Sequence, residues 1–109
     1  MDRRSDRRVF FRIPLEVEVE VTSDGQDPTA ITSRDLSEGG MRLDFLGLPT
    51  HATLQLAFVL PEEQVAERPF VVQGEVAWRK LSSTGVRFNG LSPEERVRLR
   101  SFLEGRAQA

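Results

Sequence analysis

The stretch Leu15–Val21, LEVEVEV, alternates apolar and acidic residues without a break. Successive side chains of a β-strand point to opposite faces, so this pattern predicts a strand with one buried face. The other face carries three carboxylates that we expect to meet solvent, which are Glu16, Glu18 and Glu20. The fold is therefore expected to begin with a half-buried strand.

Turn-forming residues and further alternation follow this strand. The pair Asp24-Gly25 favours a chain reversal, and a second strand is expected over Thr29–Asp35. The stretch Leu36–Gly40 predicts a tight turn, with Gly40 in a backbone conformation closed to other residues. Alternation over Met41–Phe45 then predicts a third strand.

The second half of the chain predicts three more strands. They are Thr53–Phe58, Phe70–Trp78 and a strand marked by Val86 and Phe88. Gly74 lies inside the long fifth strand, where a glycine indicates a bend or a bulge. A turn is expected at Ser82–Gly85, before the sixth strand.

A helix is expected over about 92–104. Ser92 and Glu95 have the spacing of a capping box, and Pro93 suits the first helical turn. Gly105 is expected to end the helix. Its apolar stripe consists of Leu99, Phe102 and Leu103. Six short strands and one terminal helix indicate an all-β class with a C-terminal helix, either an antiparallel barrel or a sandwich.

The amino-acid composition limits the kinds of function that we expect for this chain. A chain of 109 residues with 39% hydrophobic and 29% charged residues fits one globular domain. It contains no Cys, one His and no Tyr, so we expect no enzyme, no cofactor and no metal site. No run of ~18 apolar residues and no signal peptide is present, so we expect a cytoplasmic protein without membrane insertion.

Charge is distributed unevenly along the chain. Residues 1–12 hold five Arg against two Asp, whereas residues 13–91 hold six basic against twelve acidic residues. We expect residues 1–12 to form a flexible basic arm and residues 13–109 to form the folded body. An acidic body argues against a nucleic acid polymer as partner, and the basic arm favours a small anionic ligand.

Two motifs carry candidate ligand contacts. Arg8 and Arg12 form RxxxR, whose guanidinium groups could bind phosphate oxygens or a guanine edge. The alternative is a solvated basic tail. The second motif is DLSEGG, with candidate residues Asp35, Ser37, Gly39 and Gly40. Asp35 could accept hydrogen bonds from a base or fix an arginine, and Ser37 could reach a phosphate or a base. The alternative is a hairpin turn in which both side chains only satisfy backbone amides.

Together the motifs resemble the PilZ domain family, bacterial receptors for cyclic di-GMP. RRVFFR precedes the first strand, DLSEGG joins the second and third, and VAW, GVRF and LSPEERVRLRSFL resemble the closing strands and helix of the family. The resemblance covers residues 7–104 and implies a six-stranded antiparallel β-barrel of the split-barrel type. It implies that the N-terminal arm folds over the ligand.

The resemblance also implies roles for the candidate residues. Arg8 and Arg12 would hold phosphates and guanine edges, while Asp35, Ser37 and Gly40 would contact a guanine and shape the turn. Arg7 would influence whether one cyclic di-GMP or an intercalated pair binds. Trp78 is expected in the core or at the barrel rim, with stacking on a guanine as the alternative.

The leading hypothesis is therefore a cytoplasmic receptor module of second-messenger signalling, with a place in motility or biofilm regulation. As a stand-alone domain it would signal in trans to a protein partner by ordering its arm. A second hypothesis is a protein-interaction adaptor with a silent nucleotide site. A third is single-strand nucleic-acid binding, which the basic arm favours and the acidic body does not.

Overall fold

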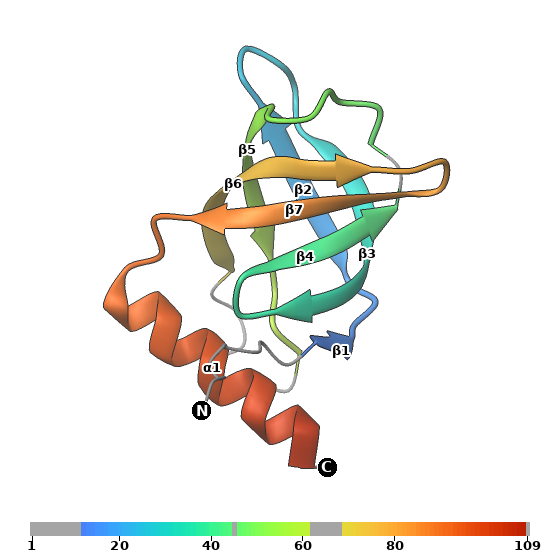
Figure 1. The fold of residues 1–109 in the computed structure, drawn as a ribbon. Coiled ribbons are helices and arrows are strands. Elements are labelled where there is room, and N and C mark those ends of the chain that lie inside the picture. The colour runs from blue at the N-terminus through green and yellow to red at the C-terminus, as the bar shows by residue number, and fades with distance from the viewer. Residues whose placement is uncertain (1–11, 45, 62–68, 109) are drawn as a thin grey trace, which may run out of the picture.

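The computed structural model describes residues 12–44, 46–61 and 69–108. It contains seven strands and one C-terminal helix (Figure 1). The elements are β1 (Arg12–Pro14), β2 (Glu18–Ser23), β3 (Thr29–Ser37), β4 (Gly40–Asp44), β5 (Thr53–Phe58), β6 (Phe70–Arg79), β7 (Ser83–Asn89) and α1 (Pro93–Gln108). Among the described residues, no helix combines the length and the apolar character that a membrane crossing requires.

Six of the strands close into an antiparallel barrel, as predicted. The hydrogen-bonded order is β3-β2-β5-β6-β7-β4, and a further pairing of β3 with β4 completes the circuit. The short strand β1 pairs with the C-terminal end of β3, outside this circuit. Because the sheet closes on itself, each of these six strands has a hydrogen-bonded neighbour on both sides.

The first predicted strand begins later than expected, since β1 ends at Pro14 and β2 starts only at Glu18. The predicted alternation holds, since Leu15, Val19 and Val21 are buried and the three glutamates are exposed. The ladder is nevertheless interrupted at residues 15–17, because the Ser33 hydroxyl donates to the Leu15 carbonyl and accepts from the Val17 amide. One strand over Leu15–Val21 was therefore a wrong prediction, and a buried hydroxyl is the reason.

Two glycines have roles other than those predicted from the sequence. Gly74 pairs regularly with Leu54 and Phe88, and the irregularity of β6 lies between Val76 and Trp78 instead. A Cβ at Gly74 would lie 2.9 Å from the Arg87 carbonyl oxygen, so close packing requires this glycine. Gly85 belongs to β7 rather than to a turn, and the chain reverses around Lys80, whose amide donates to the Ser83 carbonyl.

The helix covers one end of the barrel (Figure 1). Its capping box forms as predicted, with Ser92 and Glu95 each donating a backbone amide to the other's side chain. Leu99 and Leu103 are buried in the barrel core, and the Arg98 guanidinium lies over the Phe70 ring. The helix continues past Gly105, because this glycine does not adopt the positive φ that would terminate it.

Candidate nucleotide site

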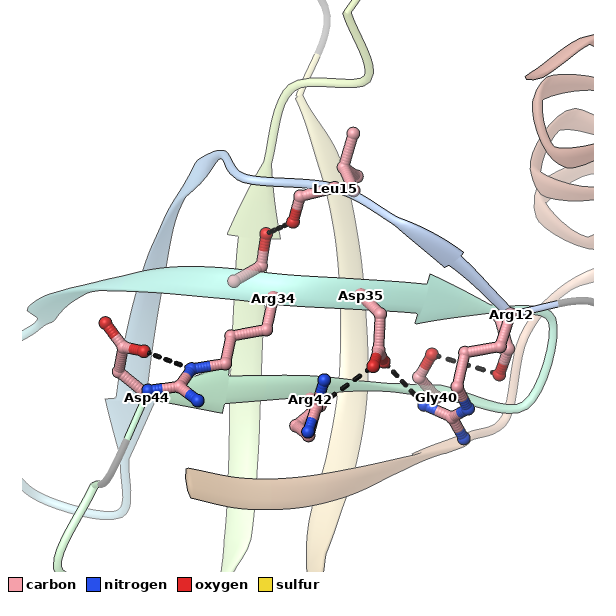
Figure 2. A network of polar contacts seen from close by, with 9 residues as sticks. Arg12, Leu15, Arg34, Asp35, Gly40, Arg42 and Asp44 are labelled. Carbon is pink, nitrogen blue, oxygen red and sulfur yellow. Dashed lines mark hydrogen bonds and ion pairs between the residues drawn. The ribbon is translucent and has the colours of Figure 1, made fainter. Parts of the chain in front are cut away.

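Asp35 lies between two arginines from neighbouring strands (Figure 2). Arg12 Nη1 on β1 lies 2.6 Å from Asp35 Oδ1, and Arg42 Nε on β4 lies 3.0 Å from Oδ2. The Asp35 side chain is 10% exposed, whereas those of Arg12 and Arg42 are 56% and 41% exposed. The carboxylate thus holds two guanidinium groups whose remaining donors reach solvent, which is an arrangement that can receive an anion.

The turn after Asp35 is held by its own serine. Ser37 Oγ donates to the Gly40 carbonyl at 3.2 Å and accepts from the Gly39 amide at 3.3 Å. Asp35, by contrast, bonds arginines, so the alternative in which both side chains serve only the turn holds for Ser37 alone. Both belong to a hairpin whose loop is Glu38 and Gly39.

Gly40 is required for space and not for an unusual backbone conformation. Its φ is not positive, contrary to the prediction. A Cβ at this position would lie 2.1 Å from the Val86 carbonyl oxygen, because β7 approaches β4 closely there. Any side chain would therefore push the two strands apart.

Trp78 lies on the outer face of the same wall, at 38% exposure. The register shift between Val76 and Trp78 inserts one extra residue into β6, which brings Trp78 opposite Gly85. The indole rests directly on this glycine, since a Cβ there would lie 2.2 Å from the ring. This exposure excludes the predicted core position, and Trp78 lines the same hollow as Gly39 and Gly40 of the hairpin.

A small hollow joins these residues. Its volume is about 190 Å³, and its lining includes Arg12, Ser37, Gly39, Gly40 and Trp78 together with Arg87. Enclosed ligand pockets usually measure about 300–1,000 Å³, so a dinucleotide seated here would extend beyond the hollow. Two larger hollows, of about 750 and 570 Å³, lie elsewhere on the barrel, and the charged residues among their described lining are acidic. An anionic ligand is better matched by the small hollow.

A second polar cluster adjoins the hollow. Arg87 Nη2 lies 3.4 Å from Glu75 Oε2, and His51 Nδ1 lies 3.2 Å from the same oxygen. The hydrogen bond with His51 is the main reason that the pKa of Glu75 falls below its usual range, with Asn89 and Arg87 acting in the same direction. Among the described residues, no three His, Cys, Asp or Glu side chains gather as a metal-ligand set.

The hairpin is also tied to the helix. Arg100 Nη2 on α1 lies 2.6 Å from Glu38 Oε2 in the loop. This contact raises the pKa of Arg100 above its usual value. The candidate site and the C-terminal helix therefore share one ion pair.

The structure brings together most of the residues that the sequence singles out. Arg12, Asp35, Ser37, Gly39, Gly40 and Trp78 lie along one outer face of β1, β3, β4 and β6. Arg7 and Arg8, like the predicted arm as a whole apart from Arg12, lie outside the described residues. Sequence reasoning missed Arg42 and Arg87, because their proximity to the motifs depends on strand register.

Solved structures share this fold at low sequence identity. The motility inhibitor MotI/DgrA of Bacillus subtilis matches with a TM-score of 0.80 and 17% identity, over 97% of this chain and 54% of that chain. The PilZ domain of Escherichia coli YcgR, solved with c-di-GMP, matches with a TM-score of 0.71 and 19% identity, over 94% and 95%. The PilZ domain of CeSA from a cellulose-synthesizing bacterium matches with a TM-score of 0.68 and 18% identity, over 89% and 98%.

Sequence comparison gives the decisive evidence on the family. No curated protein sequence matches the chain significantly. The family model of the PilZ domain, however, matches residues 3–105, which include both motifs and the C-terminal helix. The chain therefore belongs to the PilZ domain family.

Proposed function

We propose that this domain is a receptor for cyclic di-GMP, which it binds without chemical change. The observation that carries the proposal is the Asp35 carboxylate held between Arg12 and Arg42, beside the Ser37–Gly40 turn. This arrangement offers guanidinium donors to phosphates and a carboxylate edge to guanine N–H groups. The YcgR domain solved with c-di-GMP has the same fold, which supports this choice of ligand.

The proposed contacts follow the motifs. Arg8 and Arg12 bind phosphates and guanine edges, while Asp35, Ser37, Gly39 and Gly40 form the facing wall. Trp78 offers an exposed ring on which a guanine can stack. Arg7 favours an intercalated pair of ligands over a single one, since its charge offsets the extra phosphates.

Signalling is proposed to follow from ordering of the arm, residues 1–12. The arm holds five arginines and two aspartates, and a dianionic ligand offsets most of its net positive charge. The liganded arm then forms a surface that a protein partner recognises in trans, with the cytoplasm as the compartment and motility or biofilm formation as the process affected. The resemblance to a motility inhibitor supports this kind of partner.

Calorimetric titration with cyclic di-GMP tests the receptor role. We expect micromolar or tighter binding, with GTP and cyclic di-AMP as ligand controls and Arg8→Ala/Arg12→Ala as the variant that loses binding. The stoichiometry, one or two ligands per chain, tests the role of Arg7. No heat and no thermal shift at ligand excess would refute the receptor role and leave the adaptor with a silent nucleotide site.

A further inference from the structure

Arg12 and Arg87 flank the hairpin turn from opposite sides. Arg12 on β1 stands directly across from Ser37, and Arg87 on β7 stands directly across from Gly40. Ser37 and Gly40 are themselves joined across the turn by a hydrogen bond. Both arginines contribute to the lining of the same hollow, from opposite sides of the turn.

Gly40 leaves the space between these arginines open. It has no side chain, and the close approach of β4 to β7 at this point forbids one. A ligand seated on the turn can therefore reach Arg87 without displacing another side chain of the hairpin. Trp78 borders the same space from β6.

The ion pair of Arg87 leaves donors for a ligand. Only Nη2 contacts Glu75, at 3.4 Å, whereas strong guanidinium–carboxylate hydrogen bonds measure about 2.7–2.9 Å. The same Glu75 oxygen is shared with His51, and the Arg87 side chain is 57% exposed. A guanidinium carries five N–H donors, so most of its capacity remains for an anion.

We propose that Arg87 is a further ligand contact of this site, binding a phosphate oxygen of the cyclic dinucleotide opposite Arg12, with Glu75 as its competing anion. The inference rests on the proposed function, since the phosphate belongs to that ligand. A cyclic dinucleotide carries two phosphodiesters, and cations on both sides of the turn match both. Glu75 holds Arg87 in place between ligands and competes with the phosphate for it.

Calorimetric titration of the full chain with cyclic di-GMP tests this assignment through variants of equal size. Arg87→Gln is expected to weaken binding by about tenfold, the usual scale of one charge-assisted contact. Arg96→Gln removes the same charge from an exposed helix position and serves as the control. Glu75→Gln is expected to tighten binding by about threefold, and to do so only while Arg87 is present.

Arg87→Lys separates a phosphate contact from a base contact. An ammonium group binds a phosphate as a point charge but cannot form the paired hydrogen bonds that read a guanine edge. We expect Arg87→Lys to remain within about threefold of the wild type. A loss as large as that of Arg87→Gln would overturn the assignment to phosphate.

The remaining outcomes distinguish this inference from the proposed function. If the wild-type chain does not bind cyclic di-GMP, the proposed function fails and the inference fails with it. If the wild type binds while Arg87→Gln matches Arg96→Gln, the receptor role stands and Arg87 is not a contact. Should Arg87→Gln unfold, the Glu75→Gln titration decides, because unchanged affinity there contradicts competition for Arg87.

Discussion

The β2–β5 wall and the β3–β4 wall belong to one barrel but distribute their polar residues differently. On β2, every acidic residue faces solvent and the apolar residues Val19 and Val21 face the core. On β3, Ser33, Asp35 and Ser37 are all buried, and the register with β4 shifts between Ser33 and Asp35. The first wall follows the period of a half-buried strand, and the second departs from it.

The departures on the second wall coincide with the candidate site. Asp35 is buried and paired with Arg12 and Arg42, and Gly40 stands where a side chain cannot fit. Burying a carboxylate costs free energy unless it is paired, so such an arrangement is not the most stable filling of a sheet surface. Proteins accept local violations of this kind mostly at functional sites. The comparison supports the proposal that the regular wall serves mainly stability and the irregular wall serves ligand binding.

Leu56→Ala gives the largest expected effect, and it belongs to the regular wall. Leu56 on β5 is fully buried, so its truncation should lower the free energy of unfolding by about 3 kcal/mol. Urea denaturation measures this loss, with the exposed Glu18→Ala on β2 as control. The folded variant should keep its affinity for cyclic di-GMP. A large loss of affinity would contradict the division of roles between the two walls.

Asp35→Ala is expected to show the opposite behaviour. Loss of the carboxylate releases Arg12 and Arg42 and removes the proposed guanine contact, which should weaken cyclic di-GMP binding by about thirtyfold. The free energy of unfolding should fall by only about 1 kcal/mol, since both arginines can turn to solvent.

Asp44→Ala is the matched control for Asp35→Ala. It also removes an aspartate–arginine pair, with Arg34, from the same two strands. Arg34 does not line the hollow, whereas Arg12, the partner of Asp35, does. Calorimetry and thermal unfolding on both variants make the comparison. Equal losses of affinity would show that Asp35 acts through general charge.

Gly40→Ala tests whether the hairpin depends on close strand packing. The added Cβ meets the Val86 carbonyl oxygen, so β4 and β7 must separate, at a cost of about 2 kcal/mol in unfolding free energy. Gly105→Ala is the contrasting variant. It adds a methyl to open space in α1 and should stabilise by about 0.5–1 kcal/mol. Chemical denaturation of both variants should therefore give shifts of opposite sign.

Prediction from sequence succeeds where a feature depends only on residues that are close together in the chain. The alternation of β2, the capping box of Ser92 and Glu95 and the turn at Gly25, whose φ is 71°, all depend on residues close in the chain. Six short strands predict either a barrel or a sandwich, and the resemblance to the PilZ family implies the barrel that the structure shows. These features carry most of the fold.

Prediction fails where a residue's role depends on a neighbouring strand. The need for glycine at 40 comes from Val86, which lies far along the chain, and the need for glycine at 85 comes from Trp78 on the neighbouring strand β6. Arg87 becomes a candidate contact only through its register with Gly40, and Trp78 faces the hollow only because of the shift in β6. No periodicity within one strand encodes such cross-strand positions.

The smallest expected effect is on the pH dependence of stability. It compares Glu75, beside the candidate site, with Glu20 on the β2 wall. The pKa of Glu75 lies below its ordinary value of 4.5, chiefly because of His51. A carboxyl whose folded pKa is lowered stabilises the fold above its unfolded pKa, and this contribution disappears as the pH falls through the folded value. The contribution of Glu75 should therefore be constant near neutral pH and vanish below about pH 4.5. Thermal unfolding from pH 7 to 3 should show a slightly shallower acid loss for Glu75→Gln, whereas the exposed Glu20→Gln on the β2 wall should follow the wild type. Parallel curves for all three proteins would show that the contacts of Glu75 with His51 and Arg87 contribute nothing to folding.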